Sequence, residues 1–195
     1  MWNDRLKNHR IILASGSPRR KQFFVDMGLD FQIRLKPIEE IYPSSLKGSE
    51  ISDYLAKLKA SAFEDSLLEK DILITSDTVV WYMGKSLAKP STKEEASDML
   101  TELSNDWHAV ITSVTFTTPS AQRTVNHTTK VKFKSLIQEE IDYYVANFKP
   151  FDKAGAYGIQ EWIGLIGIEE IKGSYTNVVG LPTQLVYKTL MEMVN

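Results

Sequence analysis

Two adjacent arginines stand where a phosphate could bind. Arg19 and Arg20 fall in the first turn of a predicted helix, directly after the Gly/Ser turn at 14–17. A helix N-terminus presents free N–H groups and a positive dipole end, so each cation there is unfavourable by about 0.3–1 kcal/mol. A bound anion would offset that cost, and arginine binds phosphate in bidentate fashion. The alternative is a solvated turn with ordinary surface arginines.

Asp77 is a carboxylate inside a predicted buried strand. It follows the apolar run Ile72-Leu73-Ile74 and precedes Val79-Val80. A buried carboxylate is costly unless it is paired or binds a metal. Such a group can accept a proton from water or hold a divalent cation. The alternative is an aspartate at the end of a strand, hydrogen-bonded within a turn.

Other segments could complete a nucleotide site. Lys59 lies beside the apolar stripe of a predicted helix, and Lys89 precedes Pro90. Each alone is typical of a solvated lysine, but with the two arginines they could supply the positive charge that a triphosphate needs. The loop 152–160 (DKAGAYGIQ) offers an amide and backbone groups that could bind a base edge. The alternative for this loop, and for the similar loop 173–182, is a tight connection.

The elements that would position these residues are a mixture of helices and strands. Apolar runs, period-two alternation and helix-capping residues predict them. Two long neighbouring strands are typical of a hairpin, so we expect an α/β fold with a mixed sheet. The predicted strands are 11–14, 30–35, 72–82, 108–118, 122–134 and 163–171, and the predicted helices are 18–27, 50–68, 92–103, a helix capped by Ser135 and ending near 147, and one from Pro182.

Composition narrows the class of protein. The 195 residues include 43% hydrophobic residues, which is enough for a globular core, and the net charge of -2 argues against a general nucleic-acid coat protein. The absence of cysteine excludes disulfides, thiolate zinc sites and cysteine nucleophiles. The charged N-terminus lacks a signal-peptide core and no run is apolar enough to span a membrane, so we expect a cytoplasmic protein without a membrane partner. Spacing alone thus leads to an anion-binding α/β enzyme.

In combination, the motifs resemble those of the Maf family of nucleotide pyrophosphatases. They occur in family order over about residues 11–185, as ILASGSPRRKQFF, YLAKLKA, SDTVVW, LAKPSTKEEASDML, LSNDWHAVITSV, DKAGAYGIQ and GSYTNVVGLP. The resemblance implies an elongated fold like that of inosine triphosphate pyrophosphatases, with residues 1–195 forming a single domain and a cleft between two lobes. One departure is Asn105, where the family commonly has glycine, and a left-handed asparagine can replace it. Another is the 36–48 loop, whose sequence matches the family pattern less closely.

The same resemblance implies a reaction and roles for the candidate residues. It implies hydrolysis of a nucleoside triphosphate to the monophosphate and pyrophosphate, assisted by Mg²⁺ or Mn²⁺. Asp77 is then the general base and, with Glu40, a metal ligand. The residues implied to bind the substrate are Ser15, Arg19, Arg20, Lys59, Thr78, Lys89 and Gln160.

Substrate choice and partners are also implied. Gln160 in DKAGAYGIQ resembles the branch that acts on dTTP and UTP, modified pyrimidine nucleotides being further options, and Thr78 and Arg19 are linked to specificity as well. Two alternatives stay open: the same reaction on 7-methyl-GTP, and a non-enzymatic regulator of cell division that binds nucleic acid or protein. We expect no stable nucleic-acid complex, and a homodimer is one option for assembly.

Overall fold

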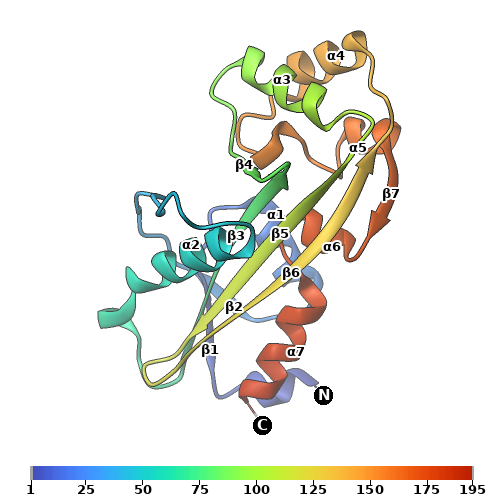
Figure 1. The fold of residues 1–195 in the computed structure, drawn as a ribbon. Coiled ribbons are helices and arrows are strands. Elements are labelled where there is room, and N and C mark those ends of the chain that lie inside the picture. The colour runs from blue at the N-terminus through green and yellow to red at the C-terminus, as the bar shows by residue number, and fades with distance from the viewer. Residues whose placement is uncertain (1, 195) are drawn as a thin grey trace.

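A seven-stranded mixed sheet forms the centre of the fold (Figure 1). The computed structural model describes residues 2–194. β1 lies parallel to β2 and β3, whereas the remaining pairs are antiparallel, so the expected mixed sheet and the β5–β6 hairpin are confirmed. In order across the sheet, the strands are β2 (Phe31–Ile33), β1 (Arg10–Leu13), β3 (Asp71–Tyr82), β5 (Trp107–Thr117), β6 (Gln122–Phe133) and β7 (Ile168–Lys172), with β4 (Lys85–Leu87) paired to β3.

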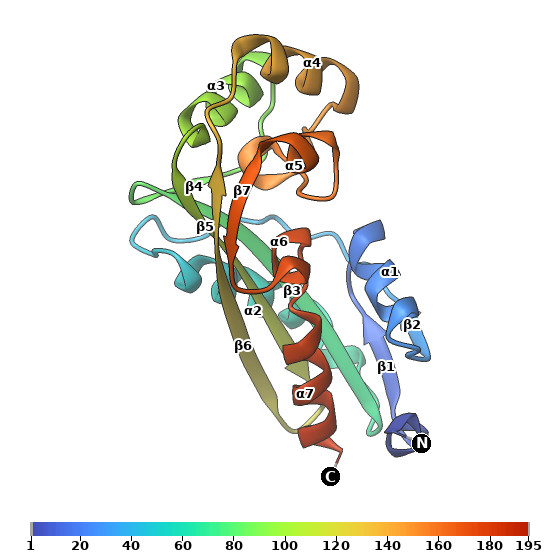
Figure 2. The same cartoon turned by 90° about the vertical axis from the view of Figure 1, so that its right-hand side faces the viewer.

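The helices gather at two ends of the long strands (Figures 1 and 2). Around β1, β2 and the termini lie α1 (Pro18–Asp26), α2 (Ser49–Ser61) and α7 (Thr183–Met193). At the other end lie α3 (Lys93–Leu103), α4 (Gln138–Phe148) and α5 (Trp162–Gly167), while α6 (Tyr175–Val179) lies near the middle. Short 3-10 turns occupy Trp2–Leu6, Glu64–Ser66 and Ala154–Ala156. Within 2–194, no helix is long and apolar enough to cross a membrane.

The alternation of side chains along β3 places a core on each face of the sheet. Ile72 and Ile74 belong to one buried cluster with Phe24 of α1 and Val186 of α7. Leu73, between them, packs instead with residues that follow and end α2. Successive side chains of a strand point to opposite faces, which explains the division. Asp77 therefore lies on a strand that is covered on both sides.

Several predicted boundaries are correct because local chemistry sets them. Ser17 caps α1 by accepting a hydrogen bond from the Arg20 N–H, with Pro18 in the first position. Thr92 likewise caps α3 through the Glu95 N–H at 3.1 Å. Asn105 is left-handed with φ 60°, as its position in place of glycine suggested.

Other predictions of secondary structure were wrong. The helix predicted to reach 68 ends at Ser61, because the chain must turn back to begin β3 at Asp71. The helix assigned a Ser135 cap begins at Gln138 with Ile137 as its N-cap, where the Glu140 carboxylate accepts from the Ile137 N–H at 3.2 Å. The strand predicted over 163–171 starts at Ile168, since 162–167 is helical. Short apolar runs do not distinguish a strand from a buried helical turn. β4 and α6 were not predicted.

Candidate active site

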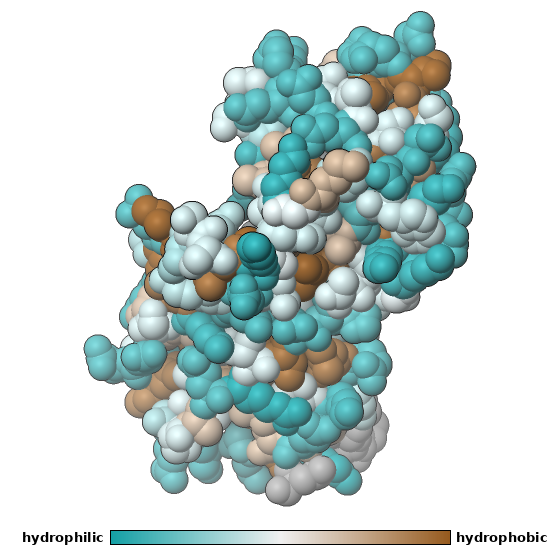
Figure 3. Space-filling model, in the orientation of Figure 1, coloured by the Kyte–Doolittle hydropathy of each residue, from teal (hydrophilic) through white to brown (hydrophobic). Residues whose placement is uncertain are grey.

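All nine of the predicted site residues line two adjoining pockets between the two groups of helices. The Gln160 pocket includes Asp77, Thr78 and Gln160, and the Glu40 pocket includes Ser15 and Glu40. The space-filling view shows the surface hollowed between the part that carries α2 and the part that carries α3 (Figure 3). Six residues line both pockets: Ser17, Arg19, Arg20, Lys59, Lys89 and Asp152.

Asp77 and Glu40 share one lysine. The Lys59 ammonium lies 2.6 Å from Asp77 Oδ1 and 3.0 Å from Glu40 Oε1. Asp77 is buried in the middle of β3, paired with Ser113 of β5, so it is not the strand-end turn aspartate considered above. Burial would raise the pKa of the Glu40 carboxyl, but the charge and hydrogen bond of Lys59, with help from Lys89, hold that pKa below its ordinary value. The Glu40 carboxylate therefore stays ionised beside a cation.

The same pair of carboxylates fits a divalent cation that arrives with phosphate. Glu40 and Asp77 direct oxygen atoms at one point, the Lys59 ammonium. Mg²⁺ is usually held by one or two carboxylates together with substrate phosphates rather than by an all-protein cage. Among residues 2–194, no group of three or more His, Asp or Glu side chains is arranged to hold a metal ion. Oxygen donors of this kind suit Mg²⁺ or Mn²⁺.

Arg20 is held by three acceptors, two from β3 and one from the residue after α6. Its guanidinium donates to the Gly180 carbonyl at 2.8 Å, the Ser76 carbonyl at 3.0 Å and Thr78 Oγ1 at 3.0 Å. Burial lowers the pKa of Arg20, against the opposing attraction of Asp77. These bonds use three of the five guanidinium N–H groups, which leaves two for a ligand. Arg20 therefore both binds α1 to β3 and to the residue after α6, and remains able to contact phosphate.

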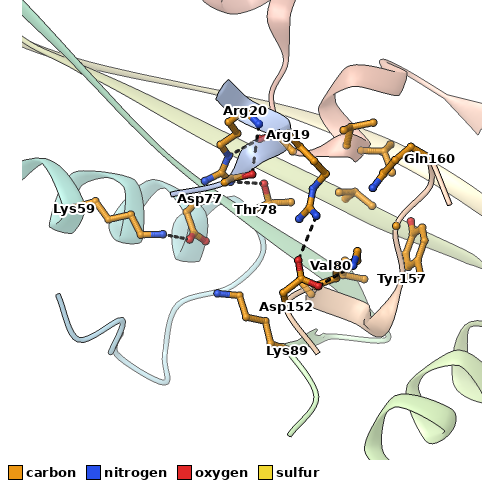
Figure 4. Close-up of a pocket in the computed structure, with 18 residues that line it drawn as sticks. Arg19, Arg20, Lys59, Asp77, Thr78, Val80, Lys89, Asp152, Tyr157 and Gln160 are labelled. Atoms are coloured by element: carbon orange, nitrogen blue, oxygen red, sulfur yellow. Dashed lines mark hydrogen bonds and ion pairs between the residues drawn. The ribbon is translucent and has the colours of Figure 1, made fainter. Parts of the chain in front are cut away.

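Arg19 reaches across the hollow to the other group of helices. Its Nη1 lies 3.3 Å from Asp152 Oδ2, and Figure 4 shows the side chain pointing from α1 toward that carboxylate. Lys153 is buried and pairs with Asp152 Oδ1 at 2.7 Å. Burial would raise the pKa of Asp152, but Lys153 and then Arg19 hold it below its ordinary value. Sequence reasoning missed Asp152, although it opens the loop that was singled out.

Three further residues of the site are Ser15, Thr78 and Lys89. Ser15 Oγ accepts from the Ser17 N–H at 3.2 Å and so shapes the turn before α1. Thr78 Oγ1 accepts from Arg20 and shares a 2.9 Å hydrogen bond with Thr112. The Lys89 ammonium is exposed and lies 3.9 Å from Glu40 Oε2. Ser15 lines the Glu40 pocket, Thr78 lines the Gln160 pocket, and Lys89 lines both.

A largely apolar wall closes the other side of the Gln160 pocket. Tyr157 lies in this wall and shares a 2.7 Å hydrogen bond with His108 Nε2 in the core. Burial raises the pKa of Tyr157 and lowers the pKa of His108 to about 4, so both stay neutral near pH 7. Gly155 is required here, because its φ is +67° and a Cβ would lie 2.9 Å from Val80 Cγ1. The remaining apolar lining residues are Val80, Val110, Ala154, Val178 and Val179.

α6 is fixed to the sheet by a buried asparagine. Asn177 Nδ2 donates to the Val110 carbonyl and to Thr129 Oγ1, both at 3.0 Å. The Asn177 backbone carbonyl accepts from the Thr112 hydroxyl at 3.1 Å, and Thr112 in turn hydrogen-bonds to Thr78, the partner of Arg20. Sequence reasoning treated 173–182 as a loop and did not assign Asn177 a role. A polar residue among valines in a glycine-bounded segment was the available signal.

Comparison with known proteins found relatives that match this chain over its whole length. The family model described as "Maf-like protein" matches residues 10–193. The chain is 56% identical over 194 residues, covering 100% of both chains, to a protein of Flavobacterium johnsoniae named dTTP/UTP pyrophosphatase. It is 47% identical to a protein of the same name from Phocaeicola vulgatus, covering 97% of this chain and 99% of that one. The solved Ham1 protein of Staphylococcus aureus shares the fold, with TM-score 0.50, 14% identity, and coverage of 94% and 99%.

Proposed function

Because this chain belongs to the Maf-like protein family, we propose that it is a hydrolase that converts dTTP and UTP to the monophosphate and pyrophosphate. The observation that carries the proposal is the position of the buried Asp77 in the Gln160 pocket, where it is held by Lys59, which lines both pockets. One pocket is bordered by cations suited to phosphates, and the other ends at an amide and an apolar wall suited to a base.

Asp77 is proposed as the general base. Its Oδ1 accepts from Lys59, whereas its Oδ2 has no hydrogen bond or ion pair within residues 2–194. That free oxygen can take a proton from a water molecule as the water oxygen bonds to phosphorus. The P–O bond between the α and β phosphates then breaks, and pyrophosphate leaves with the electron pair. Lys59 orients the carboxylate during this step.

The cations are proposed to bind and neutralise the triphosphate. Arg19, Arg20, Lys59 and Lys89 line both pockets, so a chain of phosphates lying between the pockets would contact them. Ser15 supports the turn that carries the two arginines. A Mg²⁺ or Mn²⁺ ion held by Glu40 and Asp77 would supply further charge neutralisation at the phosphates.

Gln160 is proposed to select the base. Its amide offers one donor group and one acceptor, which can pair with the N–H and carbonyl on the edge of thymine or uracil. Thr78 and Arg19 border the same pocket and are proposed to contribute to selection. In Figure 4 the side chains of Arg19, Thr78 and Gln160 surround one space.

The setting of the site is part of the proposal. Residues 1–195 would act as a single domain with the site in the cleft between two lobes, in the cytoplasm. The partner is a free nucleotide rather than a nucleic acid, which is consistent with the net charge of -2.

The test is a panel of nucleotides under one metal condition. We expect kcat/KM to be highest for dTTP and UTP, compared with CTP, GTP and 7-methyl-GTP, and pyrophosphate to be the released product. If a purine nucleotide were the best substrate, the base preference would be wrong and the reaction class would stand. Release of orthophosphate, or no turnover of any nucleotide, would overturn the reaction class itself.

A further inference from the structure

We propose that Gly158 and Tyr144 are positioning residues that determine base selectivity by fixing the Gln160 amide in its pocket. The inference rests on the proposed function, in which Gln160 selects the base. It concerns two residues that do not contact the reacting atoms. One leaves space for the amide, and the other holds both ends of the segment that carries it.

Tyr144 holds the 158–161 segment through two hydrogen bonds of its hydroxyl group. The side chain comes from α4 and is fully buried. Its hydroxyl accepts from the Gly158 N–H at 3.0 Å and donates to the Glu161 carboxylate. Burial, together with Glu161, raises the pKa of Tyr144, so the hydroxyl keeps its proton. One oxygen atom therefore fixes the residues on either side of Ile159 and Gln160.

Lys153 holds the same carboxylate from another direction. Its ammonium lies 3.0 Å from Glu161 Oε1, while Tyr144 contacts Oε2. Both oxygens of Glu161 are thus engaged, and the backbone next to Gln160 cannot rotate without breaking a charge-assisted bond. Gly158 and Ile159 are buried and Glu161 is half-buried, whereas Gln160 is exposed and lines the pocket.

Gly158 is a glycine because of what lies over it. Its φ is outside the left-handed range, so the backbone conformation does not demand glycine. A Cβ there would lie 2.9 Å from Gln160 Nε2 and 2.9 Å from Glu161 Cδ. The Gln160 amide therefore lies too close to this position for an alanine methyl to fit without a shift. The Glu161 carboxylate is held by Tyr144 and Lys153, whereas the Gln160 amide is the end of a flexible side chain, so a methyl at 158 would displace the amide first.

Displacement of the amide should change selectivity more than catalysis. Asp77 belongs to β3 and is held by Lys59 of α2, neither of which contacts the 158–161 segment through a hydrogen bond or ion pair among the described residues. An amide selects a base through the direction of its donor and acceptor, and hydrogen bonds weaken steeply when misaligned. A shifted Gln160 would therefore lose its preference for the pyrimidine edge while the phosphate side stayed intact.

The experiment is a double-mutant cycle of Gly158→Ala and Gln160→Ala, read as the ratio of kcat/KM for UTP to that for GTP. We expect each single variant to lower the ratio roughly three- to tenfold, as the loss of one hydrogen bond predicts, and the double variant to lower it no further. The matched control is Gly167→Ala in α5. That glycine also lacks a left-handed φ, and its Cβ would meet only side chains, at 3.2–3.3 Å among the three nearest atoms. Its ratio should stay unchanged.

Tyr144→Phe provides a second route if Gly158→Ala is poorly folded. It removes both bonds to the segment while keeping the ring, so the ratio should fall in the same direction at a measurable cost in Tm. If Gln160→Ala lowers the ratio but Gly158→Ala and Tyr144→Phe do not, the inference is overturned and the proposed function stands. If Gln160→Ala leaves the ratio unchanged, the inference fails together with the assigned role of Gln160. Loss of turnover in the unmodified protein would instead show that the proposed function is wrong.

Discussion

Lys59 neutralises two carboxylates in the site, with Asp77 Oδ1 at 2.6 Å and Glu40 Oε1 at 3.0 Å. The Lys59 side chain is 17% exposed and the Asp77 side chain is 10% exposed, so this pair is screened less than a surface pair. A triphosphate that enters the pocket competes with both carboxylates for this ammonium. A divalent cation that arrives with the substrate would neutralise the carboxylates when Lys59 turns to the phosphates. This gives a physical reason to expect a divalent cation in this reaction.

We predict that Asp77→Asn lowers kcat about 10²–10⁴-fold, which is the usual effect of removing a general base. The amide oxygen can still accept from Lys59, so the fold and nucleotide binding should be retained, but the amide cannot take a proton from water. Steady-state kinetics and nucleotide titration would measure the two effects. Asp98→Asn is a suitable control, because Asp98 is exposed on α3.

A near-normal kcat for Asp77→Asn would contradict the assignment. Restoration of kcat by excess Mg²⁺ or Mn²⁺ would show that Asp77 serves as a metal ligand and not as the base.

At the residue scale, contacts between residues that lie far apart along the chain could not be predicted from the sequence. Arg19 and Gln160 could be predicted because each belongs to a recognisable motif. Asp152 could not, because its importance depends on α1 facing the loop after α4, 133 residues away. The role of Tyr144 could not be predicted either, because nothing in the sequence of its helix indicates that its hydroxyl contacts Gly158 and Glu161.

At the scale of elements, Arg20 connects α1, β3 and the residue after α6. Arg19, its neighbour, makes one partly exposed ion pair with Asp152. The two residues therefore differ in structural importance although their sequence context is shared. Buried acceptors that lose a donor cost about 1–3 kcal/mol, whereas exposed ion pairs contribute about 0–1 kcal/mol.

We predict that Arg19→Ala and Arg20→Ala both lower kcat/KM by about 1.5–3 kcal/mol for every triphosphate, because each removes a charge-assisted contact to phosphate. In urea unfolding, Arg20→Ala should also lose about 1–3 kcal/mol of stability, since the Gly180 carbonyl, the Ser76 carbonyl and Thr78 Oγ1 each lose a donor. Arg19→Ala should stay within about 1 kcal/mol of the unmodified protein. Equal stability of the two variants would refute the difference in roles, and effects on kcat/KM below twofold would favour a purely structural pair.

Elements with strong local signals were predicted well, and those set by tertiary contacts were not. The long β5–β6 hairpin and the capped helices α1 and α3 follow from alternation and capping residues. α5 and α6 have six and five residues, too few for periodicity to identify. α6 exists because the Asn177 side chain bonds to β5 and β6, a stabilising contact that no local pattern contains.

At the scale of the whole molecule, the neutral His108 links the core at the α3–α4 end to the pocket. It stacks on Phe133 with ring centroids 5.6 Å apart and shares a hydrogen bond with Tyr157. Burial lowers the pKa of His108 from its ordinary 6.5 to about 4. Between these values the unfolded chain binds a proton that the folded chain does not. The free energy of unfolding therefore falls as the pH drops through this window.

We predict a loss of about 3 kcal/mol of stability from this residue between pH 6.5 and 4, with no contribution above pH 6.5 and no further change below pH 4. Denaturant unfolding at several pH values would measure it. His108→Gln, which can still pair with Tyr157, should flatten the slope between pH 6.5 and 4.5. Glu40 and Asp152 have lowered pKa values and lose their contributions at lower pH, so they do not account for this upper part. An unchanged slope in the variant would contradict the prediction.

β3, β5 and β6 run past the site as one continuous ladder, with β3 paired to β5 from Leu73 to Trp81 and β5 to β6 along its whole length. The Arg19–Asp152 pair crosses the hollow above this ladder. Widening the hollow would therefore bend or twist the shared strands. We expect this deformation to be spread along the paired strands and not to be confined to a hinge. We expect the hollow to widen only slightly, because the strained strands oppose the motion. The same strain would return the site to its closed shape after each product leaves.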